Sequence, residues 1–307
     1  MLAPRRVRAA ARDQSTHRPP GRDPASRPGV GHRLDSARPS AAARRSARGE
    51  GEGSGAVPEL FDLTGKVALV TGGTRGLGRA MAHAFADHGA DVIVSSRKPE
   101  ACARVAAEIA AKGRRSLGHP CHVAYWDQVT ALADAAYHEF GRVDVLVNNA
   151  GLSPLYPSLA QVTEELFDKV VGINLKGPFR LSALIGERMA AGDGGSIINI
   201  SSTAAEQPSP KAEPYGAAKA GLNSLTRSLA FAYGPKVRVN CIEPGPFLTD
   251  ISKAWDMPAF EASAKSSMAL QRGGRPDEIV GAALYLASEA GSFTTASVLR
   301  VDGGTRL

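Results

Sequence analysis

Thr71-Gly-Gly-Thr-Arg-Gly-Leu-Gly78 is the stretch of this chain that decides the fold. The apolar run before it, Lys66 to Val70, predicts a buried strand, and the alanine-rich stretch after it, Arg79 to His88, predicts a helix. Glycines between a strand and a helix allow a tight turn, and they let phosphate groups approach the backbone N–H groups at the helix start. The turn therefore predicts a dinucleotide-phosphate cradle, although its Gly-x-x-x-Gly-x-Gly spacing differs from the common Gly-x-Gly-x-x-Gly pattern. The residues of this predicted cradle are Gly72, Thr74, Arg75, Gly76, Leu77 and Gly78.

Strand and helix patterns alternate along the rest of the chain. The predicted strands cover residues 67–71, 91–95, 115–123, 143–148, 195–201, 236–242 and 297–301. The predicted helices begin at Gly78 and then cover residues 100–112, 127–140, 163–189, 215–233 and 276–286. Strands separated by helices imply a parallel sheet covered on both faces, so we expect one doubly wound α/β domain of the Rossmann type over residues 59–307. Ligands of such sheets bind beyond the carboxyl ends of the strands.

Tyr215 and Lys219 are four residues apart on a predicted helix, and Ser202 precedes them by thirteen positions. Residues at this spacing share one face of a helix, so the lysine ammonium group is expected beside the tyrosine phenol. A neighbouring cation favours the phenolate, and a cationic nicotinamide ring adds to this effect. Such a tyrosine can pass a proton to or from a carbonyl or alcohol oxygen. The alternative is that the two side chains share a face by chance.

Further motifs follow in order along the chain. They are Asn148-Asn-Ala-Gly151 after an apolar strand, Asn174 in Gly-Ile-Asn-Leu-Lys-Gly, Ile197-Ile-Asn-Ile-Ser-Ser202, Pro244-Gly245 with Thr249 close behind, and Val301-Asp-Gly-Gly304. Together with the glycine turn and the Ser/Tyr/Lys trio, these motifs closely resemble those of the short-chain dehydrogenase/reductase family. The resemblance runs from about Leu60 to Asp302.

The resemblance implies a role for each matching residue. Tyr215 is the general acid in carbonyl reduction or the base in alcohol oxidation, Lys219 lowers its pKa and holds the nicotinamide ribose, and Ser202 binds the substrate oxygen. Asn174 holds a water molecule that links Lys219 to solvent. The residues implied to line the cofactor are Asn149, Ala150 and Gly151 at the adenosine ribose, and Pro244, Gly245 and Thr249 at the carboxamide. For Asn148, Asn174 and Asn199, the alternative is that each only satisfies backbone groups.

The second predicted strand bears on the choice of cofactor. NAD-binding members of this fold place an acidic side chain at its end, whereas an arginine accommodates the 2′-phosphate of NADP. Here the strand ends in Ser96 and Arg97, and Arg75 lies in the glycine turn. We therefore expect NADP(H) rather than NAD, unless both arginines are only solvated surface charges. His122 and Val123 stand where many relatives have Asp-Val, so His122 either contacts the adenine or caps the strand.

The substrate is less well defined by the sequence. We expect its walls at residues 152–157 and 203–213 and in a lid around 247–268, whose apolar members are Trp255, Met257, Phe260 and Met268. These side chains suggest a pocket for a ketone or aldehyde, unless they are core contacts of a lid helix. Resemblance favours an enzyme similar to carbonyl reductases. The alternatives are a 3-oxoacyl thioester reductase and a non-catalytic, NADP-binding redox sensor.

The first 58 residues differ in composition from the rest of the chain. They contain 12 arginines, no lysine and five acidic residues, so the pI near 9.5 reflects this tail. The remainder holds 25 basic and 25 acidic residues, which argues against a nucleic-acid-binding body. The tail has too few apolar residues to offset its ordering entropy, so we expect residues 1–58 to be disordered. A transit peptide, a polyanion-binding arm and a wrongly assigned start of translation are the alternatives.

Other classes of protein are disfavoured by the sequence. No apolar run approaches the roughly 18 residues of a membrane span, and we expect a soluble, cytoplasmic protein with a small-molecule substrate and no membrane partner. The three cysteines, at 102, 121 and 241, are widely spaced, so neither disulfides nor a metal site are expected. The family resemblance implies a homo-oligomer, a tetramer or a dimer, formed through the helices at 163–189 and 215–233.

Overall fold

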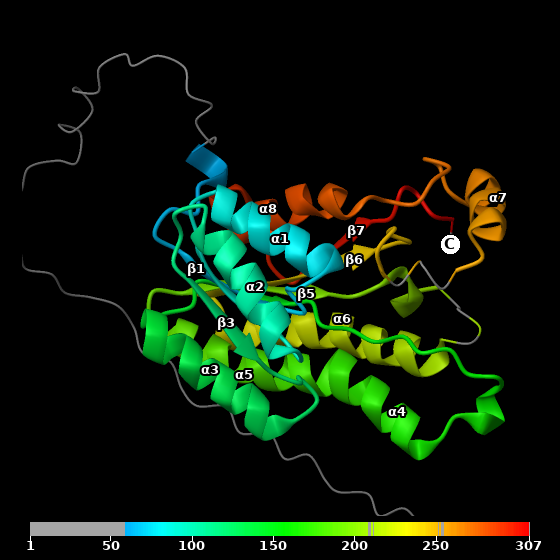
Figure 1. Ribbon diagram of the computed structural model, residues 1–307, viewed down its shortest axis with the longest axis horizontal. Coiled ribbons are helices and arrows are strands. Elements are labelled where there is room, and N and C mark those ends of the chain that lie inside the picture. Colours follow the sequence, from blue (N-terminus) through cyan, green and yellow to red (C-terminus); the bar gives the residue numbers. More distant parts are fainter. Residues whose placement is uncertain (1–58, 208–209, 211, 251, 253–254, 307) are drawn as a thin grey trace, which may run out of the picture. The chain divides into compact units, whose positions relative to one another are not determined.

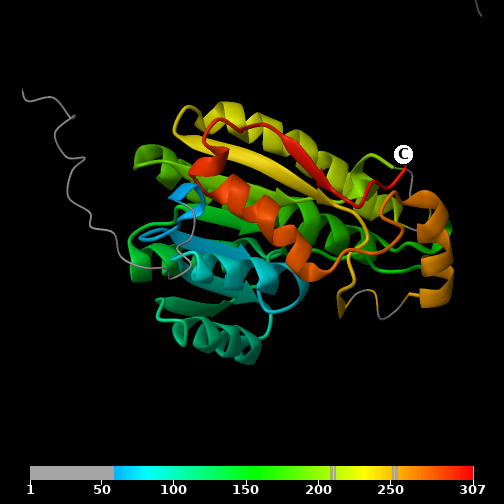
Figure 2. The same ribbon diagram turned by 90° about the horizontal axis from the view of Figure 1, so that it is seen from above.

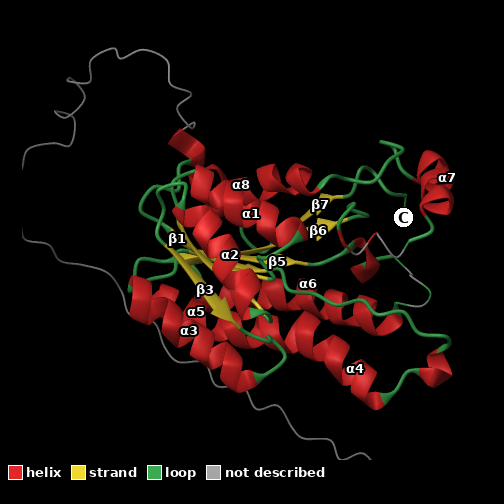
Figure 3. Cartoon of the chain, in the orientation of Figure 1, coloured by secondary structure: helices red, strands yellow, loops and turns green. Residues whose placement is uncertain are grey.

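A computed structural model describes residues 59–207, 210, 212–250, 252 and 255–306 of the chain. The predicted disordered tail, residues 1–58, lies outside the described residues. At the centre is a seven-stranded sheet in the order β3-β2-β1-β4-β5-β6-β7, in which all neighbouring strands are parallel (Figures 1 and 3). This architecture confirms the predicted doubly wound fold.

The strands follow the apolar runs of the sequence. They are β1 (Val67–Thr71), β2 (Asp91–Ser96), β3 (Ser116–Pro120), β4 (Val145–Asn148), β5 (Gly195–Ile200), β6 (Val237–Pro244) and β7 (Val298–Val301). Every residue of β1 and β4 is buried, as expected for central strands covered on both faces. Because β1 lies between β2 and β4, the chain adds β2 and β3 on one side of β1 and then crosses over to add β4 on the other side. A crevice for a ligand is therefore expected beyond the carboxyl ends of β1 and β4.

Helices cover both faces of the sheet, as the two views in Figures 1 and 2 show. One face carries α1 (Gly76–Asp87), α2 (Pro99–Ala110) and α8 (Val280–Ala287), whose buried side chains form one core cluster with the strands. The opposite face carries α3 (Trp126–Phe140), α5 (Gly177–Ala191) and α6 (Glu213–Tyr233), which form a second cluster. Within the described residues, none of the helices combines the length and apolar character that crossing a membrane requires.

The helix predicted over residues 163–189 is not a regular α-helix in its interior. It consists of α4 (Glu164–Val171), a π-helical segment (Gly172–Lys176) and α5, in one continuous run. The N–H of Gly177 donates to the carbonyl of Gly172, five residues back, which is the π-helical pattern. Such a segment inserts one extra residue into a turn, and hydrophobic periodicity does not reveal it. The predicted strand at 115–123 is also too long, because β3 ends at Pro120.

Candidate active site

The glycine turn and the Asn-Asn-Ala-Gly motif meet at the carboxyl ends of β1 and β4. The Asn149 side chain donates to the carbonyl oxygens of Thr71 at 2.9 Å and Gly72 at 3.2 Å. A Cβ atom on Gly78 would lie 2.3 Å from Asn149 Nδ2 and 2.4 Å from the Gly72 oxygen. Only glycine fits at position 78, so the turn and the motif are packed as one unit. The structure therefore gives Asn149 a direct role in shaping the predicted cradle.

The start of α1 leaves backbone donors available to an anion. Arg75 is its N-cap residue and makes no side-chain capping bond, and the first turn contains no acidic residue. The first N–H groups of a helix have no partner within the helix, and they carry partial positive charge. Gly76 has a φ of 52°, and a Cβ atom there would come within 3.4 Å of Thr249. The cradle thus faces Thr249, and these residues fit the diphosphate of a dinucleotide.

The side chains that are predicted to bind the 2′-phosphate of NADP lie around the end of β2. Thr74 of the glycine turn donates to the Ser96 hydroxyl at 3.1 Å. Arg75 and Arg97 are both exposed, and among the described residues neither has an ion-pair partner. The guanidinium of Arg97 lies near enough to His122 to lower the pKa of that imidazole, although burial lowers it more. Two unpaired cations beside the cradle provide the charge that an extra phosphate requires.

His122 makes its own local contacts. Its backbone N–H donates to Gln128, its ring nitrogen Nδ1 accepts from the backbone N–H of Ala124 at 3.3 Å, and its ring lies 4.7 Å from that of Tyr125. These bonds agree with the expectation that His122 caps the strand end. Val123, the next residue of the predicted site, is buried.

Lys219 and Tyr215 occupy one side of α6 near its start. The Lys219 ammonium group lies 5.7 Å from the centre of the Tyr215 ring and donates to the carbonyl of Ile200, the last residue of β5, at 2.7 Å. Lys219 is only 3% exposed, and burial lowers its pKa to about 8. The predicted juxtaposition of the two side chains is therefore present.

Ser202 follows β5 and starts the short turn Thr203–Ala205. Its hydroxyl accepts from the backbone N–H of Ala204 at 3.2 Å and lies close enough to Tyr215 to lower the pKa of that phenol. The first turn of α6 packs on this segment, because a Cβ atom on Gly216 would lie 2.7 Å from the Ala204 carbonyl oxygen. The small residue beside Tyr215 thus allows the helix to approach the serine turn.

The pKa of Tyr215 is determined by opposing effects. Burial raises the pKa of the phenol above its ordinary value, and the nearby Ser202 hydroxyl lowers it by a smaller amount. Lys219 is not among the groups that shift this pKa in the protein alone. The expected acidification of the phenol requires the lysine together with a bound, cationic nicotinamide ring, so it stays a prediction.

Asn174 lies in the π-helical segment and is fully buried. Its Nδ2 donates to the carbonyl oxygens of Leu152 at 2.8 Å and Val170 at 2.9 Å, and its Oδ1 accepts from the N–H of Leu152 at 3.2 Å. A Cβ atom on Gly151 would lie 3.2 Å from Asn174 Oδ1 and 3.8 Å from the Lys219 ammonium group. The asparagine thus holds the loop after β4 beside Lys219.

The other asparagines of the motifs satisfy buried polar groups. Asn148 donates to Ser182 and Asn199, and Asn199 donates to Thr226 of α6 at 2.9 Å. At the end of β6, Pro244 leads into Gly245, whose N–H donates to the carbonyl of Val301 at 3.0 Å. The structure brings the predicted site residues to the carboxyl edge of the sheet, since they end or follow β1 to β6 or lie on the helical segments beside those strand ends.

The predicted substrate walls contain a contact that the sequence did not suggest. Tyr156 is buried in the loop after β4, and its hydroxyl donates to the Glu213 carboxylate and accepts from the Glu213 N–H at 2.9 Å. The Tyr156–Glu213 pair connects the loop to the start of α6, two residues before Tyr215. The residues join segments 57 positions apart, so no local pattern predicts their contact. A cavity of about 620 Å³ beside α4 shares Glu213 but includes neither Tyr215 nor Ser202.

The predicted lid lies partly outside the described residues, because 251, 253 and 254 are among those left out. Its helix, α7, covers Met257–Ser267, and the rings of Trp255 and Phe260 lie 5.1 Å apart. Met268 is buried and contacts Gly303 near the end of the chain. Of the four apolar lid residues, Met268 is thus a core contact, and Trp255, Met257 and Phe260 are half-buried.

Comparison with known proteins places these features in a family. A family model described as enoyl-(acyl carrier protein) reductase matches residues 72–306. Dehydrogenase/reductase SDR family member 4 of Bos taurus is 39% identical over 245 residues, which cover 79% of this chain and 88% of the relative. D-threitol dehydrogenase of Mycolicibacterium smegmatis is 39% identical over 246 residues, covering 80% of this chain and 94% of the relative.

A solved structure shares the same fold. The 7α-hydroxysteroid dehydrogenase complexed with NADH and 7-oxo glycochenodeoxycholic acid has a TM-score of 0.77 against this chain, with 35% identity, and the match covers 81% of this chain and 97% of the other. The matched family consists of oxidoreductases that bind nicotinamide cofactors and act on alcohol or carbonyl groups. On its sequence, its sheet order and the residues at the carboxyl edge, this chain belongs to the short-chain dehydrogenase/reductase family.

Proposed function

We propose that this protein is an NADP(H)-dependent oxidoreductase that interconverts a ketone or aldehyde and the corresponding alcohol. The observation that carries the proposal is the convergence of three side chains at the end of β5: Ser202 lies close enough to Tyr215 to lower the pKa of its phenol, and Lys219 lies beside the Tyr215 ring. These groups supply a proton, a hydrogen bond and a positive charge at one place. Carbonyl reduction needs all three at the substrate oxygen.

In this proposal, the proton moves through the protein's own residues. When bound, NADPH supplies the hydride to the carbonyl carbon. Ser202 binds the substrate oxygen, and Tyr215 donates the phenolic proton to that oxygen as negative charge develops on it. Lys219 stabilises the resulting phenolate, and Asn174 fixes the loop that lines its ammonium group. Oxidation of an alcohol reverses these steps, with Tyr215 as the base.

The cofactor would be held by the cradle and by the charges beside it. The uncapped start of α1 and the turn from Gly72 to Gly78 would bind the diphosphate, and Asn149, Ala150 and Gly151 would line the adjoining ribose. The preference for NADP over NAD is supported by the two unpaired cations, Arg75 and Arg97, and by a serine at position 96 where an acidic side chain would select NAD. Pro244, Gly245 and Thr249 would position the nicotinamide end.

The proposed substrate class rests on the predicted substrate walls around the triad of Ser202, Tyr215 and Lys219. The half-buried apolar side chains near α7 favour a hydrophobic ketone or aldehyde. A 3-oxoacyl thioester is the alternative substrate, and the matching family model is described as enoyl-(acyl carrier protein) reductase. A non-catalytic redox sensor is less well supported, because such a protein does not need an intact Ser/Tyr/Lys set.

The direct test is an NADPH-oxidation assay with the full chain over aldehydes, ketones and acetoacetyl thioesters. Reduction of at least one ketone or aldehyde is expected, with lower activity when NADH replaces NADPH. If only thioesters react, the alternative substrate class is correct. If nothing reacts while NADPH still binds, the redox sensor is the better reading.

Tyr215→Phe is the decisive variant for this mechanism. Removing the phenolic proton is expected to lower kcat by about a thousandfold, within the range of a lost acid catalyst. The Kd for NADPH, measured by fluorescence titration, should change by less than about twofold, because the ring is retained. Tyr285→Phe, which removes a hydroxyl bonded only to Thr294, is the matched control. A Tyr215→Phe enzyme with most of its activity would remove Tyr215 from the reaction.

A further inference from the structure

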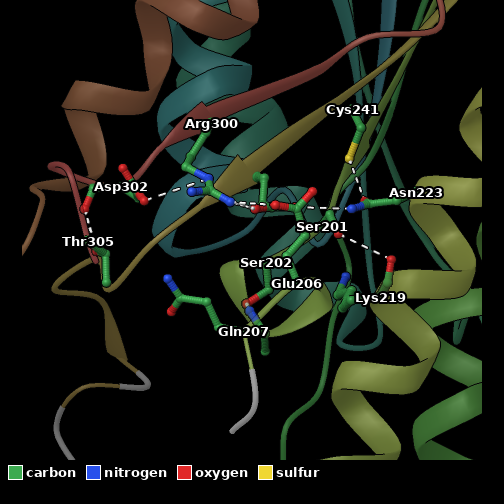
Figure 4. A network of polar contacts seen from close by, with 12 residues as sticks. Ser201, Ser202, Glu206, Gln207, Lys219, Asn223, Cys241, Arg300, Asp302 and Thr305 are labelled. Atoms are coloured by element: carbon green, nitrogen blue, oxygen red, sulfur yellow. Dashed lines mark hydrogen bonds and ion pairs between the residues drawn. The ribbon is translucent and has the colours of Figure 1, made fainter. Parts of the chain in front are cut away.

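The guanidinium of Arg300, in strand β7, is surrounded by three carboxyl groups. Its Nη2 lies 2.5 Å from Glu206 and 3.3 Å from Glu243, and its Nε lies 3.8 Å from Asp302. In Figure 4, Asp302 lies on one side of Arg300, and Ser201, Ser202 and Glu206 lie on the other. Of these four charged residues, Arg300, Glu206 and Glu243 lie outside the motifs that identified the site, and Asp302 belongs to the last of those motifs. One cation therefore connects segments far apart in the sequence.

Glu206 connects Arg300 to the serine turn. Its N–H donates to the Thr203 carbonyl at 3.1 Å, so its backbone closes the turn that begins at Ser202. The next residue, Gln207, donates through its side chain to the Arg306 carbonyl at 2.9 Å. Two consecutive side chains thus fasten this turn to β7 and to the segment that follows it.

Glu243 connects Arg300 to the helix of Tyr215 and Lys219. It lies on β6 with no exposed surface, and its second carboxyl oxygen accepts from Asn223 Nδ2 at 3.0 Å. Asn223 is one turn after Lys219 on α6. Apart from the ion pair with Arg300, the oxygen of Glu243 that faces it has no hydrogen bond within the described residues. An unpaired buried carboxylate is costly, which ties the guanidinium to this position.

We propose that Arg300 is a positioning residue that sets the placement of Ser202 relative to Tyr215 and Lys219. It contacts the serine turn through Glu206 and the tyrosine helix through Glu243 and Asn223, so both sides of the triad share one anchor. A planar guanidinium can contact several carboxylates at once, whereas a lysine offers a single point charge. The inference rests on the proposed function, because it assumes that Ser202 binds the substrate oxygen.

The first test compares Arg300→Gln and Glu206→Gln in steady-state reduction of a ketone substrate. Each variant is expected to lower kcat/KM by roughly tenfold, while the Kd for NADPH stays within about twofold. The double variant should be no worse than Arg300→Gln alone, because both changes break the same link. Arg272→Gln, which breaks an ion pair with Glu278 elsewhere on the surface, is the matched control and should retain its activity.

A second comparison separates positioning from stability. Arg300→Gln leaves Glu243 buried without its ion pair, so its melting temperature should fall. Adding Glu243→Gln removes that buried charge and should restore the melting temperature, but not kcat/KM, because Glu206 still lacks its anchor. Recovery of kcat/KM together with stability would show that Arg300 acts only on stability and would overturn the proposal.

Hydrogen exchange provides a readout that does not depend on activity. The amides of Ala205, Glu206 and Gln207 all donate within the serine turn, so they should exchange faster in Glu206→Gln and Arg300→Gln than in the unaltered protein. Unchanged exchange at these amides overturns the proposal, whatever the assay shows. If exchange rises but the unaltered protein reduces no carbonyl compound, the anchor stands and the proposed function fails.

Discussion

At the scale of single residues, the buried charge of Lys219 lowers the free energy of unfolding. Burial lowers its pKa to about 8 from the ordinary 10.5, so between these two pH values the unfolded chain binds more protons than the folded one. Stability therefore rises with pH across this window, and below it the folded protein carries the full penalty of about 3 kcal/mol. This penalty is consistent with a lysine retained for chemistry rather than for packing.

Lys219→Met is accordingly expected to stabilise the protein near neutral pH. Part of the gain is offset, because the Ile200 carbonyl loses its donor at a cost of about 1 kcal/mol. The net increase in the free energy of unfolding should be about 1–2 kcal/mol near pH 7, and it should fall to zero and then change sign as the pH approaches 10.5. Urea unfolding at several pH values measures it. Lys176→Met, at an exposed site, is the control, and an equal gain there would show that the effect is not due to burial.

Arg97→Ala tests the assignment of the 2′-phosphate. Losing a charge-assisted bond should weaken NADPH binding by about tenfold to a hundredfold and leave NADH binding nearly unchanged. Because the Arg97 charge lowers the pKa of His122, the variant should also raise that pKa, which NMR titration can follow. The matched control is Arg104→Ala, which removes a different exposed arginine, one that lies on α2. Equal losses for both cofactors would mean that Arg97 does not contact the extra phosphate.

At the scale of elements, local patterns predicted most of the fold. The bounds of β1 were predicted as observed, because an apolar run ends there at a glycine turn. The interior of the predicted 163–189 helix was not predicted correctly, because a π-helical insertion leaves the apolar periodicity nearly intact. The trio at 202, 215 and 219 could be predicted because two members lie one helical turn apart. The contacts of Tyr156 with Glu213 and of Arg300 with Glu206 could not be predicted, since they join residues 57 and 94 positions apart.

The turn before β7 provides a prediction at this scale. Ala296 precedes this strand and has a φ of 58°, in the left-handed region that favours glycine. Its N–H donates to the Val239 carbonyl at 2.8 Å, so the backbone is held in place. Ala296→Gly should relieve the strain and raise the free energy of unfolding by about 0.5–1 kcal/mol, after the entropy gained by the unfolded chain is subtracted.

The same substitution in a helix should have the opposite sign. Ala107→Gly, at an exposed position inside α2, is expected to lower the free energy of unfolding by about 1 kcal/mol. Chemical denaturation of both variants measures the pair. A destabilised Ala296→Gly protein would mean that the turn tolerates the alanine without strain.

At the scale of the whole molecule, one face of the sheet carries helices with large exposed apolar side chains. Phe179 on α5 is 42% exposed and Phe231 on α6 is 86% exposed, and Phe179 lies 6.3 Å from the half-exposed ring of Trp126. Exposed aromatic side chains on adjacent helices favour association with another chain. The family resemblance implies a homodimer or homotetramer formed through these helices, which stays a prediction.

Phe231→Ser and Phe179→Ser test this interface. If copies associate through these helices, each change should shift the protein towards monomer, because a buried aromatic anchor at an interface commonly contributes about 2 kcal/mol or more. Sedimentation velocity over a dilution series measures the shift. Phe293→Ser is the matched control, because Phe293 is fully exposed but lies between α8 and β7, away from these helices. Dissociation of the Phe293→Ser protein alone would place the interface at the β7 edge instead, since the copies would then meet through that side of the sheet.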